Sequence, residues 1–210
     1  MTWPPPPAAV SELFKGLAAG GLALLPTDTV YGLAAALDAP AGVDALYRTK
    51  RRPREQPCQV LLYAPRALAE ALAALPEPAR SVAADLLPGP ATCLVPDPEG
   101  RFRAASGASP GSVGLRAPDM GGALDALDLP LVATSANTPG GPDPATLDDI
   151  PPELRAAAAE LVAGRLPGTA SAVVDLRPLL EGGAAVVIRP GPDPDGLRAL
   201  LARHGVGGGV

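Results

Sequence analysis

Proline and glycine divide this chain into short segments, and that division constrains its fold more than any other feature of the sequence. The 210 residues include 28 prolines and 24 glycines. They separate apolar runs and form no repeat, so we interpret them as turns and as the ends of helices and strands. The longest apolar run, residues 16–25, is too short to cross a bilayer. We therefore expect many short elements around one core, without a membrane segment.

Hydrophobic periodicity within these segments predicts an intermixed set of helices and strands. Because the two types do not alternate strictly, we expect an α/β protein with a mixed sheet and flanking helices. The first strand runs into Thr27 and Asp28, which we expect to cap a following helix. The predicted helices are 9–20, 41–50, 65–75, 76–89, 151–164 and 193–205. The predicted strands are 21–26, 58–63, 90–96, 112–118, 129–137, 171–176 and 184–191.

The length of the chain suits one domain. Hydrophobic residues make up 47% of it and aromatic residues only 3%, so the core must be built from alanine, leucine and valine. We expect a flexible Pro-rich leader at residues 1–9, a single domain at residues 10–204 and a Gly-rich tail at residues 205–210.

Composition also predicts a cytoplasmic protein. The start of the chain lacks the basic and apolar regions of a secretory signal. Cys58 and Cys93 show no spacing typical of a zinc site or of a disulfide framework, which fits a reducing compartment. The formal net charge of −5 disfavours broad coating of nucleic acid, although it leaves room for one local basic site.

One basic cluster, RTKRRPR at residues 48–54, interrupts this acidic chain. Cations stabilise the C-terminal end of a helix dipole, so a solvated helix end is one explanation. Helical spacing favours another, because Lys50 falls on the same stripe as Val43 and Leu46, which we expect to be buried. A lysine on a buried face needs an anion or a route to solvent. We expect Arg52 to point toward the same anion and the other arginines to face solvent.

Polar side chains also lie at the ends of several predicted strands, where ligands of open α/β sheets usually bind. Each has an ordinary explanation, because hydroxyls and asparagine cap turns and arginine often ends a strand in solvent. Their number favours a shared anion site. Neither lysine follows a G-x-x-x-x-G sequence, so separated segments must assemble this site. The candidate residues are Thr27, Arg116, Ser135, Asn137, Ser171 and Arg189.

Seven segments resemble, in order, the motifs of the YrdC-type threonylcarbamoyl-adenylate synthases. They are LLPTDTVYGLAAAL, KRRP, PGPATCLV, VGLRAPD, LVATSAN, ASAVVDL and VIRPG. The resemblance spans about residues 10–192, and its most specific elements are K-x-R at Lys50 and Arg52 and S-x-N at Ser135 and Asn137. It implies a twisted mixed sheet around a large electropositive cavity. A longer branch of this family carries an extra C-terminal domain, for which this chain is too short.

The resemblance also implies an activity: formation of threonylcarbamoyl-AMP and pyrophosphate from L-threonine, bicarbonate and ATP, for the modification of adenosine 37 in tRNA. Mg²⁺ would enter with the ATP, and we expect neither a metal site of the protein's own nor a tightly bound cofactor. A downstream threonylcarbamoyl transferase complex and tRNA are the implied partners. The implied catalytic residues are Lys50 and Arg52, the implied ATP-binding residues are Lys50, Arg52, Ser135, Asn137 and Arg189, and the implied threonine-binding residues are Thr27, Arg116 and Ser171.

Some positions depart from the family pattern, among them Gln56, Cys58, Pro139 and Ala172. They leave open a YrdC-like relative with a different carbamoyl-adenylate substrate. An RNA-binding module is a further alternative, although single-strand readers usually need aromatic platforms that this chain lacks. The only histidine, His204, is expected to be a solvated tail residue. The implied reaction needs no side-chain nucleophile, because the substrate supplies it.

Overall fold

The structure, a computed structural model, describes residues 3–207. Within this range the chain forms nine strands: β1 Ala23–Pro26, β2 Tyr31–Ala36, β3 Gln59–Leu61, β4 Ala91–Pro96, β5 Ser112–Arg116, β6 Leu131–Ser135, β7 Ala159–Glu160, β8 Ala172–Asp175 and β9 Val186–Arg189. They make one sheet in the order β7-β1-β2-β6-β3-β5-β4-β8-β9. Three neighbouring pairs, β1/β7, β3/β5 and β4/β8, are parallel and the others antiparallel. The expected mixed α/β sheet is confirmed.

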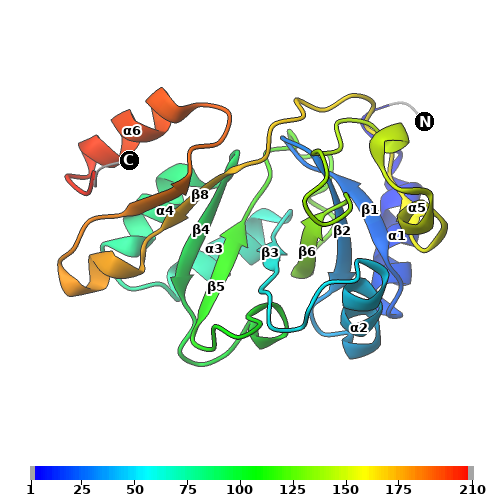
Figure 1. Ribbon diagram of the computed structural model, residues 1–210, viewed down its shortest axis with the longest axis horizontal. Helices are drawn as coiled ribbons and strands as arrows, with labels where there is room; N and C mark the ends of the chain where they lie inside the picture. Colours follow the sequence, from blue (N-terminus) through cyan, green and yellow to red (C-terminus); the bar gives the residue numbers. More distant parts are fainter. Residues whose placement is uncertain (1–2, 208–210) are drawn as a thin grey trace.

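Helices flank the sheet, with α6 beside the β8 end and α1 and α5 beside the β1 end (Figure 1). Their bounds are α1 Pro7–Ala18, α2 Pro40–Thr49, α3 Pro65–Ala73, α4 Ala79–Leu86, α5 Pro152–Ala156 and α6 Pro194–Arg203. Proline is the first residue of every described α-helix except α4. Its fixed φ suits the first helical turn, and its missing N–H would have no partner there. This explains how so many prolines coexist with helices.

Alternation along the strands gives the sheet an apolar core on both faces. In β1, Leu24 belongs to the larger buried cluster and Leu25 to a smaller one, and in β2 Leu33 and Ala34 divide in the same way. Helix α2 packs on the larger cluster and α1 on the smaller one. Burial on both faces removes the polar alternation of a half-exposed strand. Alanine, leucine and valine dominate both clusters, as the composition predicted.

The expectation that Thr27 and Asp28 cap a helix is wrong, because residues 31–36, for which the sequence predicts no strand, form strand β2. All six of its residues are buried, and it pairs with β1 on one side and β6 on the other. The sequence YGLAAA has neither alternation nor many β-branched residues, so local propensity gave no strand signal. Its position in the middle of the sheet overrides that propensity.

The predicted helix 151–164 is only partly correct. Helix α5 ends at Ala156, and β7 then pairs in parallel with β1. Ala159 N donates to Leu22 O at 2.9 Å, and Leu161 N donates to Leu24 O at 3.0 Å. The edge of β1 that faces away from β2 therefore accepts hydrogen bonds from backbone N–H groups that would otherwise bond within an alanine-rich helix.

The ends of the chain also differ from expectation. Helix α1 begins at Pro7, inside the predicted leader, and Trp3 packs against the smaller core cluster. His204 is not a solvated tail residue, because its Nε2 lies 2.9 Å from Asp85 Oδ2 and its side chain is only 22% exposed. Val206 packs against the larger cluster, whereas residues 1–2 of the leader and 208–210 of the tail lie outside the described residues.

Helices long and apolar enough to cross a bilayer are absent from residues 3–207. Both cysteines are buried and free.

Gly107 offers a test of how tightly the loop at residues 55–58 is held. It has a φ of +58°, and a Cβ there would lie 2.6 Å from Glu55 O and 2.7 Å from Pro57 N. Gly111 has a φ of +83° with nothing within 4 Å of its Cβ, so it is the matched control. Alanine at either position adopts a left-handed φ, at a cost of about 1–2 kcal/mol.

We expect Gly107→Ala to lower the free energy of unfolding by roughly 1–3 kcal/mol more than Gly111→Ala does, because only its Cβ collides with backbone. Urea unfolding of the two variants measures this difference. Equal losses in both would contradict the tight apposition of the two loops.

Candidate functional site

A cavity of about 340 Å³ opens among residues of β2, β3, β4, β5, β6, β8 and β9 and the adjoining loops. Six of the eight predicted site residues line it: Thr27, Arg52, Arg116, Ser135, Ser171 and Arg189. Arginines provide all of its cationic lining groups, and Asp143 is its one carboxylate among the described residues. The structure thus brings these six side chains, which are far apart in sequence, to one place.

The turn between β1 and β2 is organised by the side chain of Thr27. Thr27 Oγ1 accepts hydrogen bonds from the backbone N–H groups of Thr29 and Val30, at 3.2 and 3.1 Å, and donates to Val30 O at 2.6 Å. The hydroxyl therefore caps a tight turn rather than a helix, as short polar side chains often do. This turn fixes where Thr27 and Thr29 enter the cavity.

Arg116, the last residue of β5, is the most deeply buried cation of the site. It is 1% exposed, forms an ion pair with Asp28 and donates to Thr29 Oγ1 at 2.8 Å. Burial lowers the pKa of Arg116 and raises the pKa of Asp28, and each partner opposes the shift of the other. The Nη1 group has only a long contact of 3.4 Å, to Ala91 O. Nη1 therefore keeps hydrogens that the described contacts use only weakly.

Four side chains, from β3, β4, the residue before β8, and β9, form a hydrogen-bonded chain across the other half of the cavity. Thr92 Oγ1 donates to Gln59 Oε1 at 3.0 Å and lies 3.1 Å from Ser171 Oγ. Arg189 continues the chain, because its Nε donates to Ser171 O at 2.7 Å and its Nη2 lies 3.4 Å from Ser171 Oγ. These contacts hold Arg189, an otherwise exposed side chain, over the cavity.

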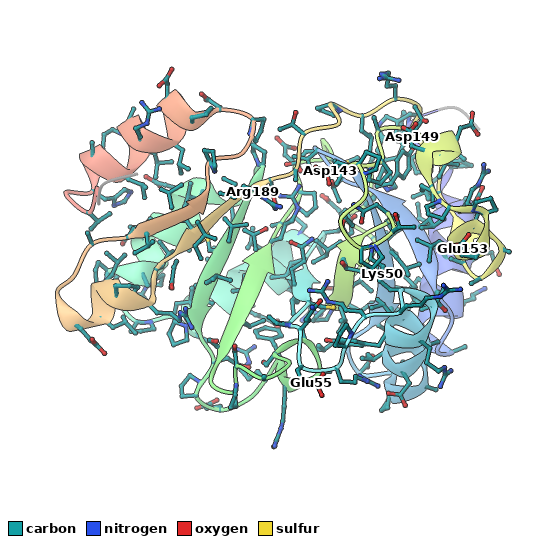
Figure 2. The ribbon with its side chains drawn as sticks, viewed as in Figure 1. Lys50, Glu55, Asp143, Asp149, Glu153 and Arg189 are labelled. Atoms are coloured by element: carbon teal, nitrogen blue, oxygen red, sulfur yellow. The ribbon has the colours of Figure 1, made fainter. Side chains whose placement is uncertain are left out.

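Lys50 lies next to the cavity but is not among the residues that line it. It is 4% exposed, which confirms that this residue falls on the buried face of its helix. Its Nζ donates to Ser135 O and Asn137 Oδ1, at 2.7 Å each, and to Asn137 O. Lys50 therefore binds the loop after β6 with its three N–H groups. Figure 2 shows its position below Asp143.

The loop after β6 is braced from within as well. Ser135 Oγ donates to Asn137 Oδ1 at 2.8 Å, and Asn137 Nδ2 donates to Gly141 O at 2.8 Å. Like Lys50, Asn137 is absent from the cavity lining. A ligand phosphate would contact the Lys50 ammonium only by replacing one of its internal bonds. Asn137 Nδ2 has a second hydrogen beside the one that it donates to Gly141 O.

Arg52 is held at the cavity by backbone carbonyls. Its Nη2 donates to Pro57 O at 2.6 Å, and its Nε makes a long contact of 3.4 Å with Gln56 O. Arg48 and Arg51 are exposed, as expected. Arg54 is exposed as well, and it forms an ion pair with Asp44 while its guanidinium lies 4.4 Å from the centroid of the Tyr47 ring. The basic cluster therefore divides into one cavity residue, one buried loop-binding residue and surface residues.

Sequence reasoning missed several residues of the cavity. Gln59 had a readable signal, since it is a polar residue within an apolar strand, whereas Thr92 and Thr29 look like ordinary strand and turn residues. Gly114 is a further case: a Cβ there would lie 3.2 Å from Thr92 Cγ2, so glycine leaves the cavity floor open between β3 and β4. The missed lining residues that carry polar side chains are Thr29, Gln59, Thr92, Thr134 and Asp143.

The side chains of this cavity suit the binding of a polyanion more than covalent catalysis. Arginine forks match phosphate and carboxylate oxygens. Cys58 also lines the cavity, but burial raises the pKa of its thiol, so the reactive thiolate is disfavoured. No group of three potential metal ligands from His, Cys, Asp and Glu occurs within residues 3–207. A magnesium ion bound to a nucleotide needs fewer protein ligands, because phosphates and water fill most of its coordination sphere.

Together, the sheet and the cavity define a mixed α/β protein with an arginine-lined site, and comparison with known proteins identifies its family. Residues 15–191 match the Sua5/YciO/YrdC family, whose description reads telomere recombination. Since this match covers most of the chain, the protein belongs to that family, and the expected resemblance is confirmed.

Individual relatives agree with this assignment. A threonylcarbamoyl-AMP synthase from Pyrococcus abyssi is 32% identical over 182 residues, which make up 83% of this chain and 52% of that protein. The structure of P. abyssi Sua5 complexed with L-threonine matches with a TM-score of 0.71 at 29% identity, over 87% of this chain and 54% of that one. The crystal structure of E. coli YciO has a TM-score of 0.75 at 20% identity, over 90% and 91% of the two chains, and supports the fold alone.

The chain spans about half the length of the first curated relatives that it matches. It covers 52% of the P. abyssi synthase and 45% of a Homo sapiens threonylcarbamoyl-AMP synthase.

Lys50 gives a direct test of the site's electrostatics. Burial, followed by the nearby charge of Arg52, lowers the pKa of Lys50 to about 8. Below that pH the ammonium supplies a hydrogen to each of its acceptors. Above it the amine has one hydrogen fewer and no charge, so its bonds to the loop after β6 should weaken. We expect the lysine NMR signal of Lys50 to titrate with a midpoint near pH 8.

The chain suits this measurement because it contains only two lysines, Lys15 and Lys50. In a Lys15→Arg variant carrying isotope-labelled lysine, the one remaining signal belongs to Lys50. A midpoint near the ordinary lysine value of about 10.4 would contradict the buried position described here.

Proposed function

We propose that this protein is an L-threonylcarbamoyladenylate synthase, a nucleotidyltransferase that forms threonylcarbamoyl-AMP and pyrophosphate from L-threonine, bicarbonate and ATP. The observation that carries the proposal is the cavity, where Arg52, Arg116 and Arg189 converge with the hydroxyls of Thr27 and Ser171 in a chain of this family. Relatives named threonylcarbamoyl-AMP synthase support the activity, and the relative complexed with L-threonine supports the amino-acid substrate.

The ATP phosphates would lie against Arg52 and Arg189, on the side of the loop after β6. Both arginines have N–H groups at the cavity, and Ser135 lines it between β6 and that loop. Lys50 and Asn137 would contribute mainly by holding the loop, because their polar atoms already bond within it. This differs from the direct phosphate contact that the sequence resemblance implied for Lys50.

Threonine would lie against the turn between β1 and β2 and the end of β5. Arg116 offers Nη1 to the amino acid's carboxylate, while Asp28 keeps the rest of its guanidinium oriented. Ser171 and Thr27 are close enough to the cavity to bond the carbamate or the threonine hydroxyl. A site that bonds a substrate hydroxyl strongly disfavours an analogue without it, because buried polar groups are then left unpaired.

The chemistry would proceed without a protein nucleophile. The threonine amine combines with bicarbonate, losing water, to give a carbamate. A carbamate oxygen then attacks the α-phosphorus of ATP, forming an O–P bond as the bond to the pyrophosphate oxygen breaks. Positioning and charge neutralisation supply most of the catalysis in such transfers. Mg²⁺ bound to the nucleotide would neutralise phosphate charge, and Asp143 is the lining carboxylate available to it.

An RNA-binding module is less well supported by this cavity. None of the residues that line it is aromatic, so the described site offers no platform for stacking bases. The proposed product is a reactive mixed anhydride, so a transferase acting on tRNA would have to consume it soon after release. That transferase and the tRNA remain the proposed partners.

The test is pyrophosphate release from ATP by the purified chain. We expect release that requires both L-threonine and bicarbonate, with serine and valine as control amino acids. Release without threonine, or none despite measurable ATP binding, would contradict the proposed substrate.

A variant of Arg52 tests the site itself. Arg52→Gln should lower kcat/KM by roughly 100-fold or more, as expected when a charged group that stabilises a transition state is removed. Arg48→Gln removes the same charge from an exposed position of the same cluster and should stay within about twofold. Equal losses in the two variants would indicate a general effect of charge and would exclude Arg52 from the site.

A further inference from the structure

Asp143 is the feature of the cavity that anion binding alone leaves unexplained. Within residues 3–207 it is the one carboxylate that lines a cavity whose cationic groups are three arginines. Among residues 3–207 no lysine, arginine or histidine lies within ion-pair distance of Asp143. The other acidic residue of the site, Asp28, is neutralised by Arg116. An unpaired carboxylate would repel a nucleotide unless a cation lay between them.

The backbone holds Asp143 at this place. It lies between Pro142 and Pro144, whose rings fix φ on both sides. Tyr31 N donates to Pro144 O at 3.0 Å, and Asn137 Nδ2 donates to Gly141 O at 2.8 Å. The segment is therefore anchored before and after Asp143, although the side chain of Asp143 has no ion-pair partner. A position fixed in this way suits a residue whose partner is a ligand.

The charge of Asp143 acts on the side of the cavity expected to take phosphates. Burial and Arg52 lower the pKa of Lys50, and Asp143 opposes that shift, so its carboxylate lies within reach of Lys50 electrostatically. In the view of Figure 2, Asp143 lies between Arg189 and Lys50. Arg116, on the proposed threonine side, is instead paired with Asp28.

We propose that Asp143 is the protein ligand of the divalent cation that enters with ATP. The proposal rests on the proposed function, because it needs a nucleotide in this cavity. Mg²⁺ prefers oxygen ligands and is commonly held by one or two carboxylates together with substrate phosphates. One carboxylate in an arginine-lined cavity fits that chemistry. It also explains why a site for a polyanion keeps a negative charge at its wall.

The test compares ATP binding by the wild type and by Asp143→Asn, by calorimetry, with excess Mg²⁺ and with EDTA. The wild type should bind ATP at least tenfold more tightly with Mg²⁺. Asp143→Asn should lose most of that difference, while its affinity in EDTA stays equal or rises because a repulsive charge is gone. Electron paramagnetic resonance of Mn²⁺·ATP gives a direct reading, since loss of a protein ligand changes the spectrum of the bound metal.

Glu55→Gln is the matched control, because Glu55 is exposed, lies near the basic cluster and does not line the cavity. It removes the same charge and should leave the metal dependence of ATP binding unchanged. If Asp143→Asn keeps the metal dependence of ATP binding and the Mn²⁺ spectrum of the wild type, only the assignment of Asp143 is overturned. A loss of threonine affinity with unaltered metal dependence would also overturn it, and would identify Asp143 as a partner of the amino group.

The two proposals fail in different ways. A wild type that binds no ATP, with or without metal, would overturn the proposed function and this assignment together. If the wild type binds ATP in a metal-dependent manner and Asp143→Asn shows the same dependence, the assignment of Asp143 fails and the proposed function stands.

Discussion

The buried ion pair between Arg116 and Asp28 is the interaction on which the rest of the site depends. Arg116 ends β5 and Asp28 follows β1, and three strands, β2, β6 and β3, separate those two in the sheet. Figure 1 shows β4, β5 and β8 on one side of β3 and β6, β2 and β1 on the other. The pair therefore joins two halves of the molecule. Removing one partner of a buried pair commonly costs about 3–5 kcal/mol, since the other charge is left uncompensated.

This constraint determines where the neighbouring groups lie. Asp28 Oδ2 also accepts a hydrogen bond from Asp119 N at 3.1 Å, which fixes the chain just after β5. Tyr63 Oη donates to Pro26 O at 2.9 Å and makes a second link from the end of β3 to the end of β1. The space enclosed between these links and the chain of Gln59, Thr92 and Ser171 is the cavity. Its arginines converge because the links draw the strand ends together.

Much of this arrangement could be predicted from the sequence, and the parts that could not have physical reasons. The prolines and glycines marked the element boundaries well, and helical spacing placed Lys50 correctly on a buried face. Strand β2 could not be predicted, because an alanine-rich run becomes a strand only when neighbours on both sides supply hydrogen bonds. Short strand β7 depends in the same way on the free edge of β1.

Residue roles were harder to predict than residue positions. The motifs identified Thr27, Arg52, Arg116, Ser135, Ser171 and Arg189, all of which line the cavity. For Lys50 they suggested a contact with phosphate, which stays a prediction, and they gave no sign that its N–H groups bind the loop after β6. The hydrogen bonds of Lys50 depend on the backbone conformation of residues 135–141, which cannot be predicted from the spacing of residues in the sequence. Asp143 was missed because an aspartate between prolines reads as an ordinary turn.

The reaction proposed for this cavity joins threonine, bicarbonate and ATP into one adenylate. The most direct measurement is mass spectrometry of the nucleotide product formed with ¹³C-labelled bicarbonate. We expect an adenylate that contains threonine and carries the label from bicarbonate. An unlabelled adenylate, or AMP with no attached amino acid under conditions that preserve mixed anhydrides, would contradict it.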